Sequence, residues 1–587
     1  MNSESNIVRN VIFPKENISP KADLYYRTES GSMSENALHI HGKATFDTYF
    51  NIFPLKKYLA YCQFSGLFLN LKVCGNFVLK IFGVNQNSEE MILEKNIHAE
   101  TVTEDITDIS DCMKKPFTHI YFSLESSNAI LYGGNFFCTA ENFNDIKIAV
   151  VICTFKREKF LLRNHREICE YLENQDILNE SNIHFCIVDN GRTLDKAVIE
   201  NEYTTLIPNK NTGGSGGFTR GYYEALHSGK HYTNILFMDD DIVLDCEMLV
   251  RVYGVLRTAK DKNLAVGGTM IKLSDFITQH EAGAIWNGKK LISLGNGADL
   301  TKRENVFEEY PDCNYNAWWF YCFPADWQKK YGYPLQFFIK EDDIEYSLRC
   351  AEKIAVLKGI AVWHDDFEGK YDGFQEYYIK RNELILTSVN HQKAYPFFQV
   401  EKLIKCVMRQ VVYQRYFLAD IVIRAYDDYL KGWEHFRNTD TEKLNIELMD
   451  SCMKLLTDEE LRQYGVYFDK EKYDTALNEK KHLFGQILTF NGYFMPKCFY
   501  KRDRDGFSMA ALAGCKFVNF YRHKKVLHYD MARKKGFVTE IKKSAFWKYS
   551  FLLLGKSVKF LIKYPSVRKG YRKHLKELSE FSPTENS

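Results

Sequence analysis

The 587-residue sequence contains no run of about 18 uncharged apolar residues, and Met1–Lys15 lacks an apolar segment of signal-peptide length. No Cys-x-x-Cys pair occurs among its 15 scattered cysteines, which is typical of reduced thiols rather than of a disulfide framework or a zinc site. The formal net charge is only +2, so the composition indicates no affinity for nucleic acid. We therefore expect a cytosolic protein without a membrane-spanning helix.

The length and the changes in residue pattern predict four regions. Residues 1–145 contain apolar and aromatic runs separated by Gly, Asn and Ser, which predicts an accessory antiparallel β-sandwich. Residues 146–395 alternate buried strands with helices, and residues 396–540 show the 3.6-residue apolar spacing of a helical domain. Residues 541–587 form a basic, aromatic tail. The strands expected in the first region are Ala44–Phe53, Gly66–Val73, Phe77–Val84, His119–Leu124 and Ala129–Cys138.

The central stretch of the second region is Ile235–Leu244, in which four apolar residues precede Asp239, Asp240 and Asp241. A buried strand of this kind ends at the edge of an α/β sheet where ligands collect. Because side chains alternate along a strand, Asp239 and Asp241 should face one side and Asp240 the other. Two such carboxylates need a cation between them, and their oxygen atoms favour Mg²⁺ or Mn²⁺. An acidic helix N-terminus is the alternative.

Two further buried stretches, Ile148–Phe155 and His184–Gly191, enclose a helical stretch that extends to about Glu173, as in a βαβ unit. Asp189 lies at the end of the second stretch. Its carboxylate could bind a base or ribose, or form an Asx-turn before Gly191.

A glycine-rich stretch, Asn211–Gly221, precedes the triple-aspartate strand. Its four closely spaced glycines are Gly213, Gly214, Gly216 and Gly217. Glycines allow close approach of a ligand to the backbone, and the following helix start favours an anion, although a flexible loop is the alternative. The spacing fits neither a Walker loop nor a dinucleotide fingerprint, so ATP and NAD are not indicated.

A second acidic cluster, Glu341 to Asp343, stands at the start of an expected helix. A carboxylate there stays ionised and can accept a proton from an attacking hydroxyl, although helix capping is the alternative. His364 follows an apolar strand and suits either a third metal ligand or a structural histidine. The adjacent Trp318 and Trp319 are costly to bury with both indoles satisfied, so at least one should face a groove; core packing is the alternative.

These stretches together resemble the inverting GT-A glycosyltransferases of family 2 and, more narrowly, the bacterial galactofuranosyltransferases. The further stretches similar to that family are Thr48–Pro54, Asn314–Phe320, Phe337–Tyr346 and Ala361–His364. The resemblance implies an α/β GT-A (Rossmann-like) catalytic domain with an N-terminal β-sandwich and a C-terminal helical domain. It also implies metal-dependent single displacement of galactofuranose from UDP-galactofuranose onto a growing, lipid-linked surface glycan.

The resemblance assigns roles to individual residues. Asp343 is the expected base, and Asp342 is the alternative because Glu341 stands where the family has an aromatic residue. Mn²⁺ or Mg²⁺ is expected at Asp239, Asp241 and His364. The residues expected to bind the UDP donor are Thr154, Arg157, Asp189, Gly213, Gly214, Gly216, Gly217, Arg220 and Asp240. Trp318 and Trp319 are expected to bind the acceptor.

The tail, residues 541–587, mixes lysine and arginine with aromatic and aliphatic residues. Such a mixture suits a helix on an anionic membrane surface, where a glycolipid acceptor would lie; a helix packed on its own domain is the alternative. The sequence leaves open whether copies of the chain associate. It also leaves open another donor, namely UDP-galactose, UDP-glucose or dTDP-rhamnose. A non-catalytic glycan-binding protein is the alternative of a different class.

Overall fold

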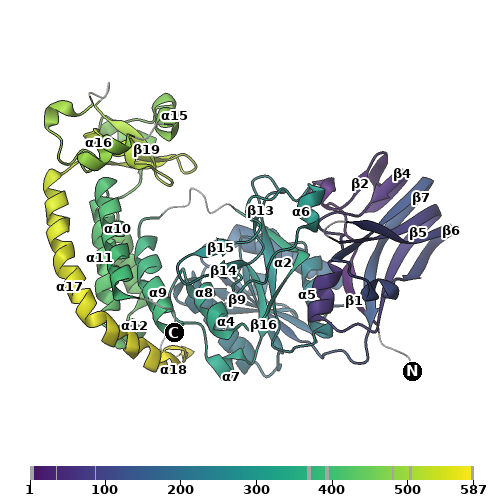
Figure 1. Cartoon of the computed structure of the whole chain (residues 1–587). Helices are drawn as coiled ribbons and strands as arrows, with labels where there is room; N and C mark the ends of the chain where they lie inside the picture. Colours follow the sequence, from purple (N-terminus) through teal and green to yellow (C-terminus); the bar gives the residue numbers. More distant parts are fainter. Residues whose placement is uncertain are drawn as a thin grey trace. The chain divides into compact units, whose positions relative to one another are not determined.

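A computed structural model describes residues 5–34, 36–85, 88–365, 372–390, 395–478, 482–501 and 506–583 (Figure 1). Internal contacts divide the chain into two compact units. The first unit comprises Met1–Pro334, Asp343–Asp365 and Phe581–Ser587, and the second comprises Leu335–Asp342 and Asp366–Glu580. The first unit therefore joins the regions expected at residues 1–145 and most of 146–395. The second unit joins the rest of 146–395 to the region at 396–540 and to most of the tail. The division into four regions stays a prediction.

The N-terminal region is one seven-stranded antiparallel sheet in the order β2–β4–β7–β5–β6, with β1 beside β7 and β3 beside β4. Its elements are β1 (Ser5–Asn10), β2 (Arg27–Thr28), β3 (Gly31–Ser34), β4 (Ala37–Thr45), α1 (Leu55–Tyr61), β5 (Gly66–Val84), β6 (Glu89–Asp108) and β7 (His119–Thr139). The antiparallel strands agree with the expectation, whereas a sandwich of two sheets stays a prediction.

Strand lengths in this sheet differ from those expected. Four expected strands merge into two, because β5 and β7 continue through bulges where Gly75 has a φ of 108°. The expected strand Ala44–Phe53 is strand only as far as Thr45. Strand β6 was not expected, because it lies at the sheet edge and most of its residues are polar and exposed.

The second region of the first unit is an eight-stranded mixed sheet with helices, so the α/β class is confirmed. Its strands are β8 (Ile148–Thr154), β9 (Ile183–Asp189), β10 (Thr204–Pro208), β11 (Asn234–Asp239), β12 (Ala265–Lys272), β13 (Gln279–Glu281), β16 (Phe320–Pro324) and β17 (Ile354–His364). Strands β8 and β9 are parallel neighbours, as the βαβ pattern predicted, and β10 and β11 extend the parallel half on either side. Strand β16 is antiparallel to both β11 and β12, and β17 is parallel to β12. The carboxyl ends of β8, β11 and β17 therefore share one edge.

The apolar runs explain why these strands lie at the centre. Ile235, Leu236, Phe237 and Met238 of β11 are fully buried. Burial of each such side chain contributes roughly 1.5–3 kcal/mol. The remaining elements are α2 (Glu158–Glu173), α3 (Lys196–Ile199), α4 (Gly213–His227), α5 (Glu247–Thr258), β14 (Ala284–Trp286), β15 (Leu291–Ser293), α6 (Arg303–Phe307), α7 (Trp327–Tyr331) and α8 (Asp342–Cys350).

The second unit is built mainly of helices (Figure 1). They are α9 (Gln375–Val389), α10 (Pro396–Val412), α11 (Tyr416–Tyr429), α12 (Trp433–Asn438), α13 (Thr441–Asp450), α14 (Asp458–Gln463), α15 (Lys470–Asn478), α16 (Leu483–Leu488), α17 (Lys543–Lys573) and α18 (Leu575–Leu578). Helices α9, α10, α11 and α17 pack around a shared apolar core. Among the described helices, none combines the length and the apolar character needed to cross a bilayer.

Residues 396–540, which were expected to form a helical domain, contain helices and also strands. Strands β18 (Leu456–Thr457), β19 (Ser508–Ala511), β20 (Lys525–Asp530) and β21 (Lys535–Glu540) form a four-stranded sheet there. Strand β18 has only two residues, and β19 and β20 are buried at almost every position, so buried and exposed residues do not alternate along them.

Candidate active site

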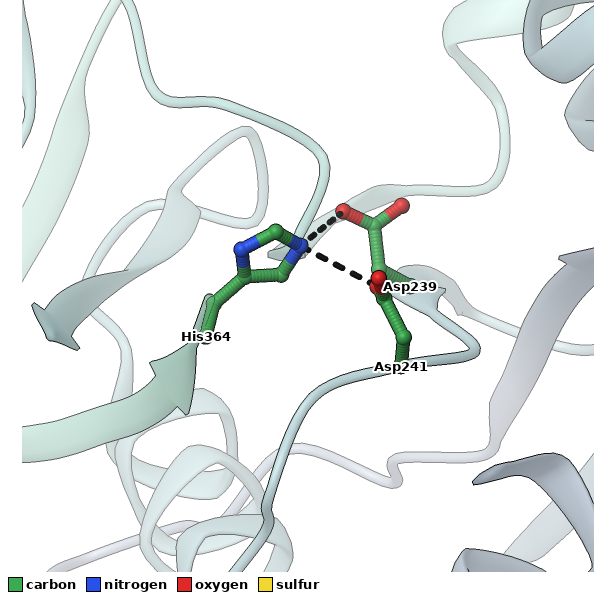
Figure 2. A group of neighbouring side chains, drawn as sticks. All are labelled: Asp239, Asp241 and His364. Atoms are coloured by element: carbon green, nitrogen blue, oxygen red, sulfur yellow. Dashed lines mark ion pairs between the residues drawn. The ribbon is translucent and has the colours of Figure 1, made fainter. Parts of the chain in front are cut away.

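Three potential metal ligands meet at the carboxyl edge of the eight-stranded sheet (Figure 2). Asp239 ends β11, Asp241 follows two residues later, and His364 ends β17. A backbone bridge between Val243 and Trp363 joins the two segments, with N···O distances of 2.7 and 3.0 Å. One ligand atom from each of the three side chains lies within 4.8 Å of the others. Strand pairing thus brings together residues that lie more than a hundred positions apart.

The geometry of His364 fits a cation in this cluster. Its Nε2 lies 3.1 Å from Asp241 Oδ1 and 3.9 Å from Asp239 Oδ2. Its Nδ1 lies 2.7 Å from the carbonyl oxygen of Asp365, which can only accept, so Nδ1 carries a hydrogen. Nε2 therefore faces two carboxylates with either a proton or a lone pair. Two carboxylates and an imidazole form a donor set that suits a divalent cation such as Mn²⁺ or Mg²⁺.

Electrostatics of the cluster show the same need for positive charge. Burial raises the pKa of Asp239 to about 6, and the nearby Asp241 and Asp343 carboxylates act in the same direction. Burial also raises the pKa of Asp240 to about 7, and the neighbouring Asp241 and Asp239 carboxylates act in the same direction. Burial alone would lower the pKa of His364, but Asp241 and Asp239 raise it above its ordinary value.

Arg157 supplies one positive charge to the triple aspartate. It follows β8, and its Nη1 contacts Asp241 Oδ2 and lies 3.5 Å from Asp240 Oδ1. The Arg157 side chain remains about half exposed, whereas the carboxylates of Asp240 and Asp241 are almost fully buried. The guanidinium thus covers the solvent side of these two carboxylates.

The glycine-rich stretch is helical from its first glycine, whereas the helix was expected to follow the stretch. Helix α4 begins at Gly213, whose φ is 69°. A Cβ atom at Gly217 would lie 2.1 Å from Cys153 Sγ, and one at Gly221 would lie 2.3 Å from Val151 Cγ1. The glycines therefore let α4 pack directly on β8. A Cβ at Gly214 would meet no atom within 4 Å, so the helix N-terminus is open there.

Two residues expected to bind the donor make other contacts. Asp189 accepts hydrogen bonds from the backbone N–H groups of Gly191, Thr193 and Leu194 at 2.7–2.9 Å, which is the turn-forming alternative. Arg220 pairs with Glu224 at 2.8 Å on α4. Donor contacts of these two residues stay predictions.

Asp343 lies near the group formed by Asp239, Asp241 and His364. Its Oδ2 accepts a hydrogen bond from the Tyr315 hydroxyl at 2.8 Å, and its Oδ1 accepts one from the backbone N–H of Ile344 at 2.8 Å. Its charge reaches Asp239, whose pKa it raises. Asp342 is the first residue of α8. The two hydrogen bonds fit Asp343 as the base, and the assignments of Asp343 and Asp342 both stay predictions.

Glu281, which was not expected from the sequence, belongs to the same neighbourhood. It ends β13 and is 3% exposed. Oε2 accepts a hydrogen bond from the Ser293 hydroxyl, whereas Oε1 is buried with no hydrogen-bond partner among the described residues. Burial raises the pKa of Glu281 to about 7, and the Asp343 charge adds to this. The sequence signal is weak, because Glu281 is a single acidic residue at the end of a three-residue strand.

The two tryptophans do not meet the expectation that at least one faces a groove. Each is 5% exposed. Trp318 packs edge-on against Phe218 and Phe237, at centroid distances of 5.5 and 4.9 Å. Trp319 is satisfied in the interior because its Nε1 donates to the Gly268 carbonyl oxygen at 2.9 Å. A role in acceptor binding stays a prediction for both.

Comparison with known proteins adds to this geometry. No protein-family model matches the chain. The chain is 28% identical over 428 residues to the galactofuranosyltransferase GlfT2 of Mycobacterium tuberculosis, an alignment that covers 67% of this chain and 66% of that protein. The chain is similar to galactofuranosyltransferases. It is also 24% identical over 429 residues to GlfT2 of Mycolicibacterium smegmatis, over 67% of this chain and 65% of that protein.

The resemblance to galactofuranosyltransferases indicated by the motifs is therefore confirmed. The chain spans just under two thirds of the length of each relative. A solved structure of GalNAc-T7 with UDP, GalNAc and Mn²⁺ is similar with 12% identity and a TM-score of 0.30, over 43% of this chain and 49% of that one. A likeness at that level supports no further argument.

Asp241→Ala should weaken Mn²⁺ binding on the order of a hundredfold, because it removes one of three potential ligands and leaves Arg157 without its closest partner. Titration of free Mn²⁺ by electron paramagnetic resonance measures this directly. Asp111→Ala, at an exposed position paired with Lys114, is the matched control and should bind Mn²⁺ as the native chain does. Equal affinity in the Asp241→Ala variant would exclude this carboxylate as a ligand.

Glu281→Gln should flatten the dependence of stability on pH. The folded state keeps the Glu281 proton up to a pKa of about 7, whereas an unfolded glutamate releases it near 4.5. Native stability should therefore fall as pH rises through this window, by at most about 3 kcal/mol. Urea unfolding in metal-free buffer at pH 5 and pH 8 measures the difference. Glu173→Gln, at an exposed position, is the control, and an unchanged slope in Glu281→Gln would contradict the assignment.

Proposed function

We propose that the chain is an inverting glycosyltransferase that moves galactofuranose from UDP-galactofuranose to a growing glycan. The observation that carries the proposal is the meeting of Asp239, Asp241 and His364 with the Asp343 carboxylate at one sheet edge. A nucleotide sugar requires a cation and anion-binding backbone, and its transfer requires a base. The names of the two relatives support the choice of sugar.

The metal cluster is the expected place for the donor diphosphate. Asp239, Asp241 and His364 would hold Mn²⁺ or Mg²⁺, which supplies positive charge to a departing nucleoside diphosphate. The open N-terminus of α4 at Gly214 and the half-exposed Arg157 guanidinium offer further groups for an anion.

Asp343 performs the proton transfer in this proposal. The acceptor hydroxyl oxygen attacks the anomeric carbon from the face opposite UDP, and its proton passes to Asp343. The new carbon–oxygen bond forms while the bond to UDP breaks, so the configuration inverts and UDP leaves as the anion. The hydrogen bonds from Tyr315 and Ile344 orient the carboxylate, and the N-terminus of α8 favours its ionised form before the transfer.

The test is nucleotide release from several donors with Mn²⁺ and a galactosyl acceptor. UDP-galactofuranose should turn over selectively when compared with UDP-galactose, UDP-glucose and dTDP-rhamnose. Turnover of another donor would retain the glycosyltransferase and reject the furanose. Binding of glycan without turnover of any donor would favour the non-catalytic alternative.

In the same assay, Asp343→Asn should lower transfer by roughly a thousandfold or more, because the amide cannot accept the proton. Its UDP affinity should stay within a few fold of the native value. Asp342→Asn is the matched control and should retain most activity. The reverse result would assign the base to Asp342.

Association with an anionic membrane forms the second part of the proposal. Helix α17 packs on its own unit through buried residues, including Tyr549, Leu553 and Phe560. One face of α17 therefore packs on its own unit, as the alternative predicted, while another face exposes apolar side chains to solvent. These are Trp547, Phe551, Leu554, Val558 and Ile562, which are 55–72% exposed.

Helix α16 carries further exposed apolar side chains. Phe484, Ile487 and Leu488 are 69–82% exposed, and Phe494, which follows this helix, has its ring 5.9 Å from that of Trp547 on α17. Lysines accompany the apolar residues of α17, although Lys556 and Lys559 are paired with Asp427. Exposed aromatic and aliphatic residues beside lysines suit a bilayer with anionic headgroups, where a lipid-linked acceptor would lie.

The double variant Phe551→Asp with Ile562→Asp should weaken binding to vesicles containing anionic lipid by tenfold or more, because two apolar contacts become charged. Sedimentation with vesicles at two salt concentrations measures this. Val198→Asp, at another exposed apolar position (59% exposed), is the matched control and should bind normally. Native binding by the double variant, or self-association of the native chain that the substitutions abolish, would contradict the membrane assignment.

A further inference from the structure

The segment directly before α8 has an unfavourable backbone. Phe338, Lys340 and Glu341 have φ angles of 75°, 68° and 68°. Such left-handed conformations are uncommon for residues with a Cβ atom, and each costs free energy that the surroundings must supply. Three of them within four positions require support from outside the segment.

Asn382 on α9 provides much of that support within the second unit. Its side-chain Nδ2 lies 2.9 Å from the carbonyl oxygens of both Ile339 and Lys340, and 3.3 Å from that of Phe337. The two N–H bonds of the carboxamide are thus shared among three carbonyl groups. Asn382 is fully buried, so water cannot replace these contacts.

Neighbouring groups hold Asn382 and the segment firmly. Arg381 Nε donates to Asn382 Oδ1 at 2.9 Å, and Arg381 Nη2 donates to the Phe337 carbonyl oxygen at 2.9 Å. The Arg381 guanidinium lies 5.1–5.3 Å from the ring centroids of Tyr377, Tyr378 and Phe436. Phe338 stacks on Tyr378 at 5.2 Å between centroids. The carboxamide therefore has a fixed orientation.

We propose that Asn382 is a positioning residue for the base Asp343, an inference that rests on the proposed function. The segment held by Asn382 runs directly into α8 at Asp342. Its backbone path consequently determines where the first turn of α8 begins and where the Asp343 carboxylate points. Asn382 acts through the chain and needs no contact with donor or acceptor.

Asn382→Ala should lower kcat by tenfold or more, while the KM for UDP-galactofuranose and the Kd for UDP stay within about threefold. Hydrogen exchange measured by mass spectrometry should speed up in residues 338–345 of the same full-length protein. Asn519→Ala is the matched control, because Asn519 is also buried and donates to a backbone carbonyl, that of Ala476, at 2.7 Å. It should leave both readouts unchanged.

A second pair of variants separates positioning from loss of folding. Glycine adopts a positive φ without the cost that a Cβ imposes. Adding Lys340→Gly to Asn382→Ala should therefore restore kcat at least threefold, whereas adding Lys340→Ala should not. Equal recovery by both, or faster exchange with unchanged kcat, would overturn the positioning role. If the native chain releases no nucleotide from any donor, the proposed function fails, while the exchange data still show whether Asn382 holds the segment.

Discussion

The arrangement of the candidate site depends on the three carboxylates gathered at the end of β11, two of which are almost fully buried. Asp239, Asp240 and Asp241 leave the end of β11 together, and the raised pKa values of Asp239 and Asp240 show how poorly that place accommodates negative charge. Arg157 and His364 approach from two other strand ends and reduce the repulsion. The apolar β11 is what removes the carboxylates from water in the first place. Burial by the sheet therefore makes this group of carboxylates favour nearby positive charge.

The sheet topology converts this local requirement into a site. A mixed sheet in which β8, β11 and β17 end at one edge lets residues distant in sequence converge without any loop having to reach across the fold. The Val243–Trp363 bridge then sets the spacing between the aspartates and His364. Glu281 at the end of β13 is affected by the same charges, because burial and the nearby Asp343 carboxylate both raise its pKa.

The sequence predicted those parts of the site that are specified locally. Three aspartates after an apolar run, glycines before a helix and a histidine after a strand are each visible within about ten residues. The antiparallel pairing of β16 with β11 and β12 was not predictable in the same way, because these partners lie far away in the sequence. For the same reason Glu281 had no signal, and the burial of Trp318 depends on partners from α4 and β11. In the second unit, β20 is buried at five of its six residues, so it shows no alternation of apolar and polar residues.

The contact between α4 and β8 has a consequence for how the protein can diverge. Position 217 has no room for even one methyl group above Cys153, and position 221 has none above Val151. Both are closed to variation as long as those strand residues remain. Gly214, by contrast, faces open space on the same helix turn. Side chains larger than glycine are therefore expected in related chains at position 214, and not at positions 217 and 221.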